Sequence, residues 1–128
     1  MKYRFYYAGI RVRNVPRSLR FYTKALGMRP DNQGTMGHGG KYVQLVSPRS
    51  QMRLELNWYP PGSTYASRYT TGEELDHLAF VVDDVEKAHE DVLRKGAKSV
   101  VSPAKAKRDK VEVYVKDPDG IWIELLQG

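Results

Sequence analysis

The sequence contains an internal repeat, and this repeat constrains the fold more than any other feature. The segment that begins at Tyr7, YAGIRVRNVPRSLRFYTKALG, resembles the segment that begins at His77, HLAFVVDDVEKAHEDVLRKG. A later pair of segments also matches, MRLELN around Glu55 and IWIELL around Glu124. Tyr7 and His77 stand 70 residues apart and Glu55 and Glu124 stand 69 apart, so both positions recur in register. A repeat over most of a short chain indicates a duplicated structural unit.

Each copy is predicted to form a strand, a helix and three further strands. In the first copy, alternating side chains predict a strand over residues 4–12, and Asn14 and Gly27 have the properties of helix start and stop residues. In the second copy, Asp84 caps a helix that ends before Gly96. The expected later strands are 28–35, 41–46 and 52–58 in the first copy, and 98–101, 111–115 and 121–126 in the second.

The arrangement of these elements predicts the fold class. The turn sequence Asp117-Pro118-Asp119-Gly120 joins the last two strands as a hairpin. Residues 59–74 are rich in Pro, Gly, Ser and Thr and are interpreted as a linker. We therefore expect an α+β fold, in which two tandem βαβββ modules, 4–58 and 75–126, form a curved mixed sheet around a cavity.

Composition limits the classes of protein that the chain can belong to. With 128 residues, 41% of them apolar and 28% charged, residues 1–128 are expected to form one domain. No apolar run approaches the roughly 18 residues of a membrane span, and the first residues do not resemble a signal peptide, so a cytoplasmic protein without a membrane partner is expected. The absence of cysteine excludes disulfides, thiolate metal sites and cysteine nucleophiles.

The net charge of +6 raises the question of a nucleic-acid partner. Lysine and arginine are spread along the chain, and the one dense run, KAKRDK over residues 105–110, has no base-stacking motif beside it. We therefore expect no nucleic-acid partner, and interpret the charge as a basic surface that attracts an anionic small molecule.

Three residues in the apolar strands are candidates for chemistry. Glu55 and Glu124 lie in otherwise apolar segments, where a carboxylate without a partner would lose several kcal/mol of solvation energy. His77 begins an apolar run, and imidazole is a common metal ligand. Each residue alone has a simpler reading, a solvent-facing or ion-paired Glu or a hydrogen-bonded core His. Their recurrence in register across the repeat favours one shared site.

The sequence resembles the vicinal oxygen chelate superfamily, which includes glyoxalase I, methylmalonyl-CoA epimerase, extradiol dioxygenases and the bleomycin- and fosfomycin-resistance proteins. The resemblance is carried by the helix SLRFYTKALGM, the hairpin DPDG before IEL, and the strand segments GIRV, LELNW and DHLAF. It implies the glyoxalase/bleomycin resistance fold for almost the whole chain. The sequence is most similar to glyoxalase I-like members.

The resemblance also implies a metal site and its ligands. In glyoxalase I-like members the metal is held at the positions of Tyr7, Glu55, His77 and Glu124. Tyr7 departs from the family, which normally has His or Gln there, and a phenol coordinates only if the metal displaces its proton. The other three residues form a set of one nitrogen and two carboxylate ligands, which suits one divalent ion such as Ni, Co, Zn or Mn.

Further residues are implied to bind the substrate. Arg11 resembles the arginine that helps to hold the glutathionyl carboxylate in glyoxalase I-like members. Lys107 and Lys110 are expected in a loop where related proteins often hold an anionic substrate, although a solvated charge run is an equal alternative. Trp122 shares a strand face with Glu124 and is expected to line the cavity, the alternative being a packing role.

The function implied by the resemblance is that of a divalent-metal-dependent lyase or isomerase like glyoxalase I. It would act on a 2-oxoaldehyde–thiol adduct by proton transfer through an enediolate, with Glu124 and Glu55 as catalytic carboxylates. A homodimer with a small-molecule substrate is expected. The alternatives are a metal-free binding protein of the drug-resistance kind and an epimerase of the same superfamily.

Overall fold

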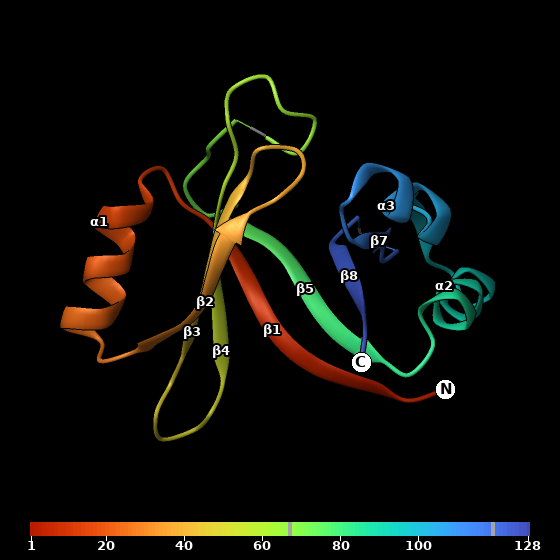
Figure 1. Cartoon of the computed structure of the whole chain (residues 1–128), viewed down its shortest axis with the longest axis horizontal. Coiled ribbons are helices and arrows are strands. Elements are labelled where there is room, and N and C mark those ends of the chain that lie inside the picture. The colour runs from red at the N-terminus through yellow and green to blue at the C-terminus, as the bar shows by residue number, and fades with distance from the viewer. Residues whose placement is uncertain (67, 119) are drawn as a thin grey trace. The chain divides into compact units, whose positions relative to one another are not determined.

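The structure is a computed structural model, and it describes residues 1–66, 68–118 and 120–128. The chain divides into two compact units, each described here by itself. Residues Tyr7–Asp76 form the N-terminal unit, and Met1–Tyr6 with His77–Gly128 form the C-terminal unit. Strands β1 (Tyr3–Arg11) and β5 (Leu75–Val82) each contribute residues to both units (Figure 1).

The N-terminal unit contains a sheet in the order β2-β3-β4-β1. The pairing of β1 with β4 is parallel, while β3 pairs antiparallel with both of its neighbours. The strands other than β1 are β2 (Arg29–Thr35), β3 (Lys41–Val46) and β4 (Arg53–Trp58). The predicted strands of the first copy are therefore confirmed, with ends that shift by a residue or so.

A helix covers one face of this sheet. The side chain of Asn14 accepts a hydrogen bond from the Arg17 amide at 2.9 Å and so caps α1 (Val15–Arg20). The chain continues through one π-helical turn, η1 (Phe21–Ala25), before Gly27 ends the helix with a φ of 71°. The apolar core on this face consists of Val43, Leu45 and Leu56, with Ile10, Val12, Val15, Leu19, Tyr22, Met28 and Leu54 packed against them.

The C-terminal unit repeats this arrangement, with its strands in the order β5-β8-β7-β6. The pairing of β5 with β8 is parallel, and β7 pairs antiparallel with both of its neighbours. The Asp84 side chain caps α2 through the Lys87 amide at 3.0 Å, as the sequence predicted. The remaining bounds are α2 (Val85–Arg94), β6 (Lys98–Val101), β7 (Val113–Lys116) and β8 (Trp122–Gln127).

The prediction of a loop around Lys107 and Lys110 was wrong. These residues belong to an additional helix, α3 (Pro103–Asp109), whose first turn is capped by Ser102 through the Lys105 amide at 3.2 Å. Lys110 follows as the C-cap in a left-handed conformation with a φ of 56°. Ser followed by Pro is a helix-start signal, but the charged run lacks apolar periodicity and buries only Ala106. The second module is therefore βαβαββ rather than βαβββ.

The predicted hairpin between the last two strands is confirmed. The Gly120 amide donates to the Asp117 carbonyl at 3.0 Å, and the Asp117 side chain accepts from the Ile121 amide at 2.9 Å. Asp119, also part of the predicted turn, lies outside the described residues. None of the helices in the described parts of the chain is long and apolar enough to cross a membrane.

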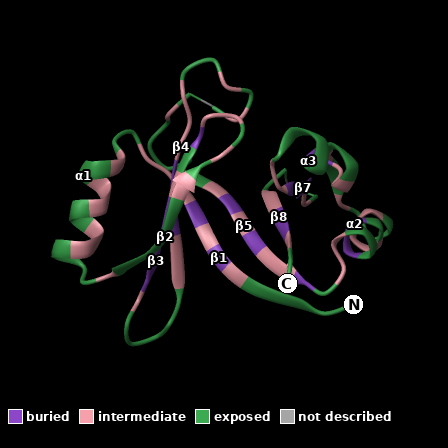
Figure 2. Cartoon of the chain, in the orientation of Figure 1, coloured by how far each residue is buried: buried purple, intermediate pink, exposed green. Residues whose placement is uncertain are grey.

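Side chains alternate between the two faces of each sheet. In Figure 2 the buried residues recur as separate bands along β1 and β5. Leu54 and Leu56 face α1, which leaves Glu55 and Asn57 on the opposite face of β4. By the same alternation, Leu125 is buried on the face where Val92 of α2 lies, and Glu124 lies on the opposite face. The α+β fold of two related modules is thus confirmed, although the second module also contains α3, and each module has one helix-covered face and one face with the acidic residue.

Truncation of Leu56 to Ala should lower the free energy of unfolding by about 2–5 kcal/mol, because it leaves a cavity beneath α1 at a fully buried position. Urea denaturation followed by circular dichroism measures this effect. Leu26→Ala is the matched control, since Leu26 is 58% exposed and the change should cost less than about 0.5 kcal/mol. Equal losses for the two variants would contradict the placement of the core.

Candidate functional site

His77 and Glu124 form a buried pair in the C-terminal unit. The parallel pairing of β5 with β8 sets Ala79 beside Glu124, and His77 precedes Ala79 on the same face of the sheet. The Nε2 atom of His77 lies 3.5 Å from Oε1 of Glu124. Their exposed fractions are only 1% and 4%. An imidazole nitrogen and a carboxylate oxygen, both ligand atoms for divalent metals, therefore converge within this unit.

Tyr114 contacts both members of this pair. Its hydroxyl donates to Oε2 of Glu124 at 3.4 Å, and its ring meets the His77 ring edge to face with centroids 5.6 Å apart. Tyr114 stands opposite Glu124 in the antiparallel pairing of β7 with β8. The hydroxyl orients one oxygen of the carboxylate, and the ring restricts the imidazole.

Glu55 occupies the corresponding place in the N-terminal unit. The parallel pairing of β1 with β4 sets Gly9 beside it, as Ala79 stands beside Glu124. Its carboxylate is buried and accepts hydrogen bonds from two amides, Nε2 of Gln44 at 3.0 Å and Nδ2 of Asn57 at 2.7 Å. Hydrogen bonds of this kind hold a carboxylate in one orientation, as outer-shell partners do for metal ligands.

The two glutamates have equivalent neighbours in the two units. Gln44 is the antiparallel partner of Glu55, and Tyr114 is the antiparallel partner of Glu124. Sequence analysis did not single out Gln44, Tyr114 or Asn57. Extension of the repeat across the hairpins would have found the first two, because they stand 70 residues apart, as Tyr7 and His77 do.

Tyr7 is a buried residue of β1, with an exposed fraction of 2%. It lies in the N-terminal unit with Glu55, whereas His77 and Glu124 lie in the C-terminal unit. Within neither unit, counting the described residues, do three or more His, Cys, Asp or Glu side chains gather closely enough to hold a metal ion. The four predicted ligands are thus divided two and two between the units.

Arg11 binds the end of the linker and the start of β5. Its guanidinium donates to the carbonyl oxygens of Leu75, at 3.3 Å, and of Glu73, and lies 3.6 Å from the Asp76 carboxylate. Its backbone amide also donates to the Glu74 carbonyl at 2.7 Å. These contacts give Arg11 a structural function, namely to fix residues 73–76 next to β1.

The other predicted substrate residues lie in the C-terminal unit. Trp122, on β8, meets the Tyr114 ring at a centroid distance of 5.4 Å, and Nζ of Lys116 lies 5.5 Å from the Trp122 ring centroid. Lys107 lies on α3 and is exposed, as is Lys110 at its end. Trp122 therefore contacts the same tyrosine that binds Glu124.

Sequence comparison finds relatives that match most of the chain. The lactoylglutathione lyase of Neisseria meningitidis serogroup A is 32% identical over 129 residues, which cover 92% of this chain and 86% of that protein. A probable lactoylglutathione lyase of Synechocystis is 30% identical over 126 residues, which cover 92% of this chain and 90% of that protein.

Solved structures share the fold at lower identity. A methylmalonyl-CoA epimerase from Mycobacterium tuberculosis matches with a TM-score of 0.73 at 19% identity, over 96% of this chain and 86% of that one. A family model, Glyoxalase/Bleomycin resistance protein/Dioxygenase superfamily, matches residues 4–125. The chain therefore belongs to the glyoxalase/bleomycin resistance protein/dioxygenase superfamily.

Proposed function

We propose that this protein is a divalent-metal-dependent lyase or isomerase like glyoxalase I, which acts on the adduct of a 2-oxoaldehyde with a thiol. The observation that carries the proposal is the pair of buried glutamates, Glu55 and Glu124, at equivalent places in the two units. Each lies beside a small residue, Gly9 or Ala79, of the strand that pairs in parallel with its own. Each also accepts a hydrogen bond from a side chain, Gln44 or Tyr114, of the antiparallel strand on its other side. The similarity to lactoylglutathione lyases over nearly the whole chain supports the same activity.

The side chains present suit a divalent ion. Glu55, His77 and Glu124 offer two carboxylates and one imidazole, all buried, and the His77 and Glu124 ligand atoms already converge. Tyr7 occupies the fourth family position, where a neutral phenol is a poor ligand. When bound, the ion would polarise the substrate's carbonyl group as a Lewis acid.

The two glutamates carry the proton transfer in this proposal. Glu124 removes the proton from the carbon next to the carbonyl and, once protonated, returns it to the neighbouring carbon of the enediolate, with Glu55 as its partner. The Tyr114 hydroxyl and the Gln44 and Asn57 amides orient these carboxylates. A precisely held base is effective because less orientational entropy is lost in the transition state.

The competing function is metal-free binding of a small molecule. The specific observation in its favour is Tyr7, which replaces a good metal ligand with a poor one at a buried position. Metal analysis separates the two functions, because only the lyase needs an ion.

The lyase proposal predicts that protein purified without a His tag binds one divalent ion per chain. Elemental analysis gives the stoichiometry, and calorimetry with Ni²⁺ or Zn²⁺ gives the affinity. His77→Ala and Glu124→Ala should each weaken binding by more than about tenfold, because each removes a ligand atom. His38→Ala is the matched control, because His38 packs against the rings of Tyr59 and Tyr65 and is not a proposed ligand, and its affinity should equal that of the wild type. Absence of metal binding by the wild-type protein would favour the binding-protein function.

Substitutions of Tyr7 determine whether its hydroxyl coordinates the ion. Tyr7→His supplies a neutral nitrogen and should tighten binding more than about tenfold. Tyr7→Phe should cause a large loss of affinity if the phenolate is a ligand, and little change if Tyr7 only packs nearby. If neither substitution changes the affinity, Tyr7 lies outside the metal site.

We further propose a homodimer in which each site takes Tyr7 and Glu55 from one chain and His77 and Glu124 from its partner. Glu55→Gln and Glu124→Gln should each abolish thioester formation from methylglyoxal and a thiol. Mixing the two inactive proteins should then restore activity, since a heterodimer has one intact site of two. Each inactive protein mixed only with itself is the control. No recovery after confirmed subunit exchange would indicate sites built within one chain.

A further inference from the structure

The N-terminal unit has an open pocket of about 570 Å³ that contains none of the four proposed metal ligands. It lies among the end of β1, the start of α1 and the last part of the linker. Its walls are formed by Ile10, Arg11, Val12, Arg13, Arg17, Ser18, Tyr22, Tyr69, Thr71 and Glu74. This volume falls within the range of about 300–1,000 Å³ that is typical of small-molecule sites.

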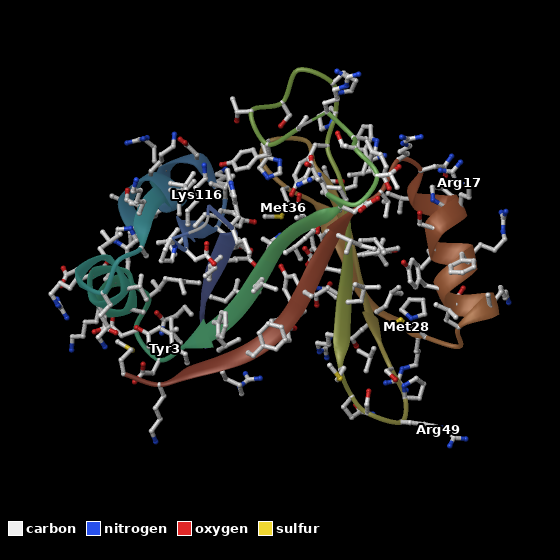
Figure 3. All side chains as sticks on the ribbon, turned by 180° about the vertical axis from the view of Figure 1, so that it is seen from behind. Tyr3, Arg17, Met28, Met36, Arg49 and Lys116 are labelled. Atoms are coloured by element: carbon white, nitrogen blue, oxygen red, sulfur yellow. The ribbon has the colours of Figure 1, made fainter. Side chains whose placement is uncertain are left out.

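Two of the three arginines in this pocket carry charge that no carboxylate of the described residues neutralises. Arg11 is bound to Asp76 and to backbone carbonyls, as described above. Arg13 and Arg17, by contrast, form no ion pair with any described residue. Arg13 lies over the Tyr69 ring at 4.1 Å, which holds its guanidinium in place. Arg17 projects from the first turns of α1 (Figure 3).

Glu74 is the one acidic residue in the pocket wall. Its two oxygens accept hydrogen bonds from the Gly72 amide, at 2.9 and 2.8 Å, and from the Tyr69 hydroxyl at 3.4 Å. The Gly72 hydrogen bonds lower the pKa of Glu74, so it is ionised at neutral pH. The single carboxylate of Glu74 is already hydrogen-bonded to these donors. The three arginines therefore give the pocket wall an excess of positive charge.

We propose that this pocket binds a small organic phosphate ester. The guanidinium groups of Arg13 and Arg17 hold the phosphoryl group, because the planar fork of arginine matches the geometry of phosphate oxygens. The hydroxyls of Ser18 and Thr71 are further donors in the wall. Ile10, Val12 and Tyr22 form an apolar part of the wall for the organic group.

Phenyl phosphate is a suitable probe, and calorimetry at fixed ionic strength measures its binding. The protein is first treated with EDTA, so that a metal at the proposed active site does not contribute and the result is independent of the lyase proposal. Saturable binding of one equivalent per chain is expected. Arg13→Gln and Arg17→Gln should each raise the Kd by about tenfold or more, the effect of losing a charge-assisted hydrogen bond.

The matched control is Arg20→Gln, which removes the same charge from an exposed arginine of α1 outside the pocket. It should change the Kd less than about twofold, because charges that do not contact the ligand are screened by salt. Glu74→Gln should lower the Kd, since it removes a negative charge from the wall. Inorganic phosphate should bind more weakly than phenyl phosphate.

Three results would overturn the proposal. The first is the absence of saturable binding by the wild-type protein, and the second is an equal loss in Arg20→Gln and in the pocket variants, which would indicate diffuse charge. The third is equal affinity for inorganic phosphate and phenyl phosphate, which would show that the apolar wall does not contribute to binding.

Discussion

The rest of the structure depends on one interaction, the parallel pairing of the first strand of each module with its last strand. In the N-terminal unit β1 pairs with β4, and in the C-terminal unit β5 pairs with β8. Because side chains alternate along a strand, a shift of one residue in either pairing would turn the glutamate to the face covered by the helix. The apolar residues on both sides of Glu55 and Glu124 prevent this shift, since they must stay in the core. The packing of the core and the position of the acidic residues are thus determined together.

Burial of these carboxylates carries an energetic cost that their neighbours offset. A buried carboxylate is tolerated when hydrogen bonds or charges replace the water it has lost. Glu55 is solvated by two side-chain amides, and Glu124 by the Tyr114 hydroxyl and the nearby His77. These polar groups lie on strands that are already fixed by their cores, so the protein can hold them in place without help from flexible loops.

Sequence reasoning predicted the repeat, the caps at Asn14 and Asp84, and the two glutamates, because each leaves a local pattern. It missed Gln44 and Tyr114, since their contacts with the glutamates depend on which residue stands opposite across a hairpin. It also missed α3, where the signal from Ser102 and Pro103 is local but the charged residues after it show no apolar face. The contacts of Arg11 with residues 73–76 could not be predicted either, because they join β1 to the end of the linker and the start of β5, which lie far from Arg11 in the sequence.

The difference between Gln44 and Tyr114 has a consequence for the symmetry of the molecule. Duplication of a module creates two identical acids, and a reaction in which one of them moves the proton needs them to differ. In this chain the glutamates themselves remain the same residue, while the residue opposite each one differs, an amide for Glu55 and a phenol for Glu124. The two acids therefore differ through the residues opposite them on β3 and β7. Substitution of those residues can change the surroundings of each acid separately, while the residues that would hold the metal stay the same.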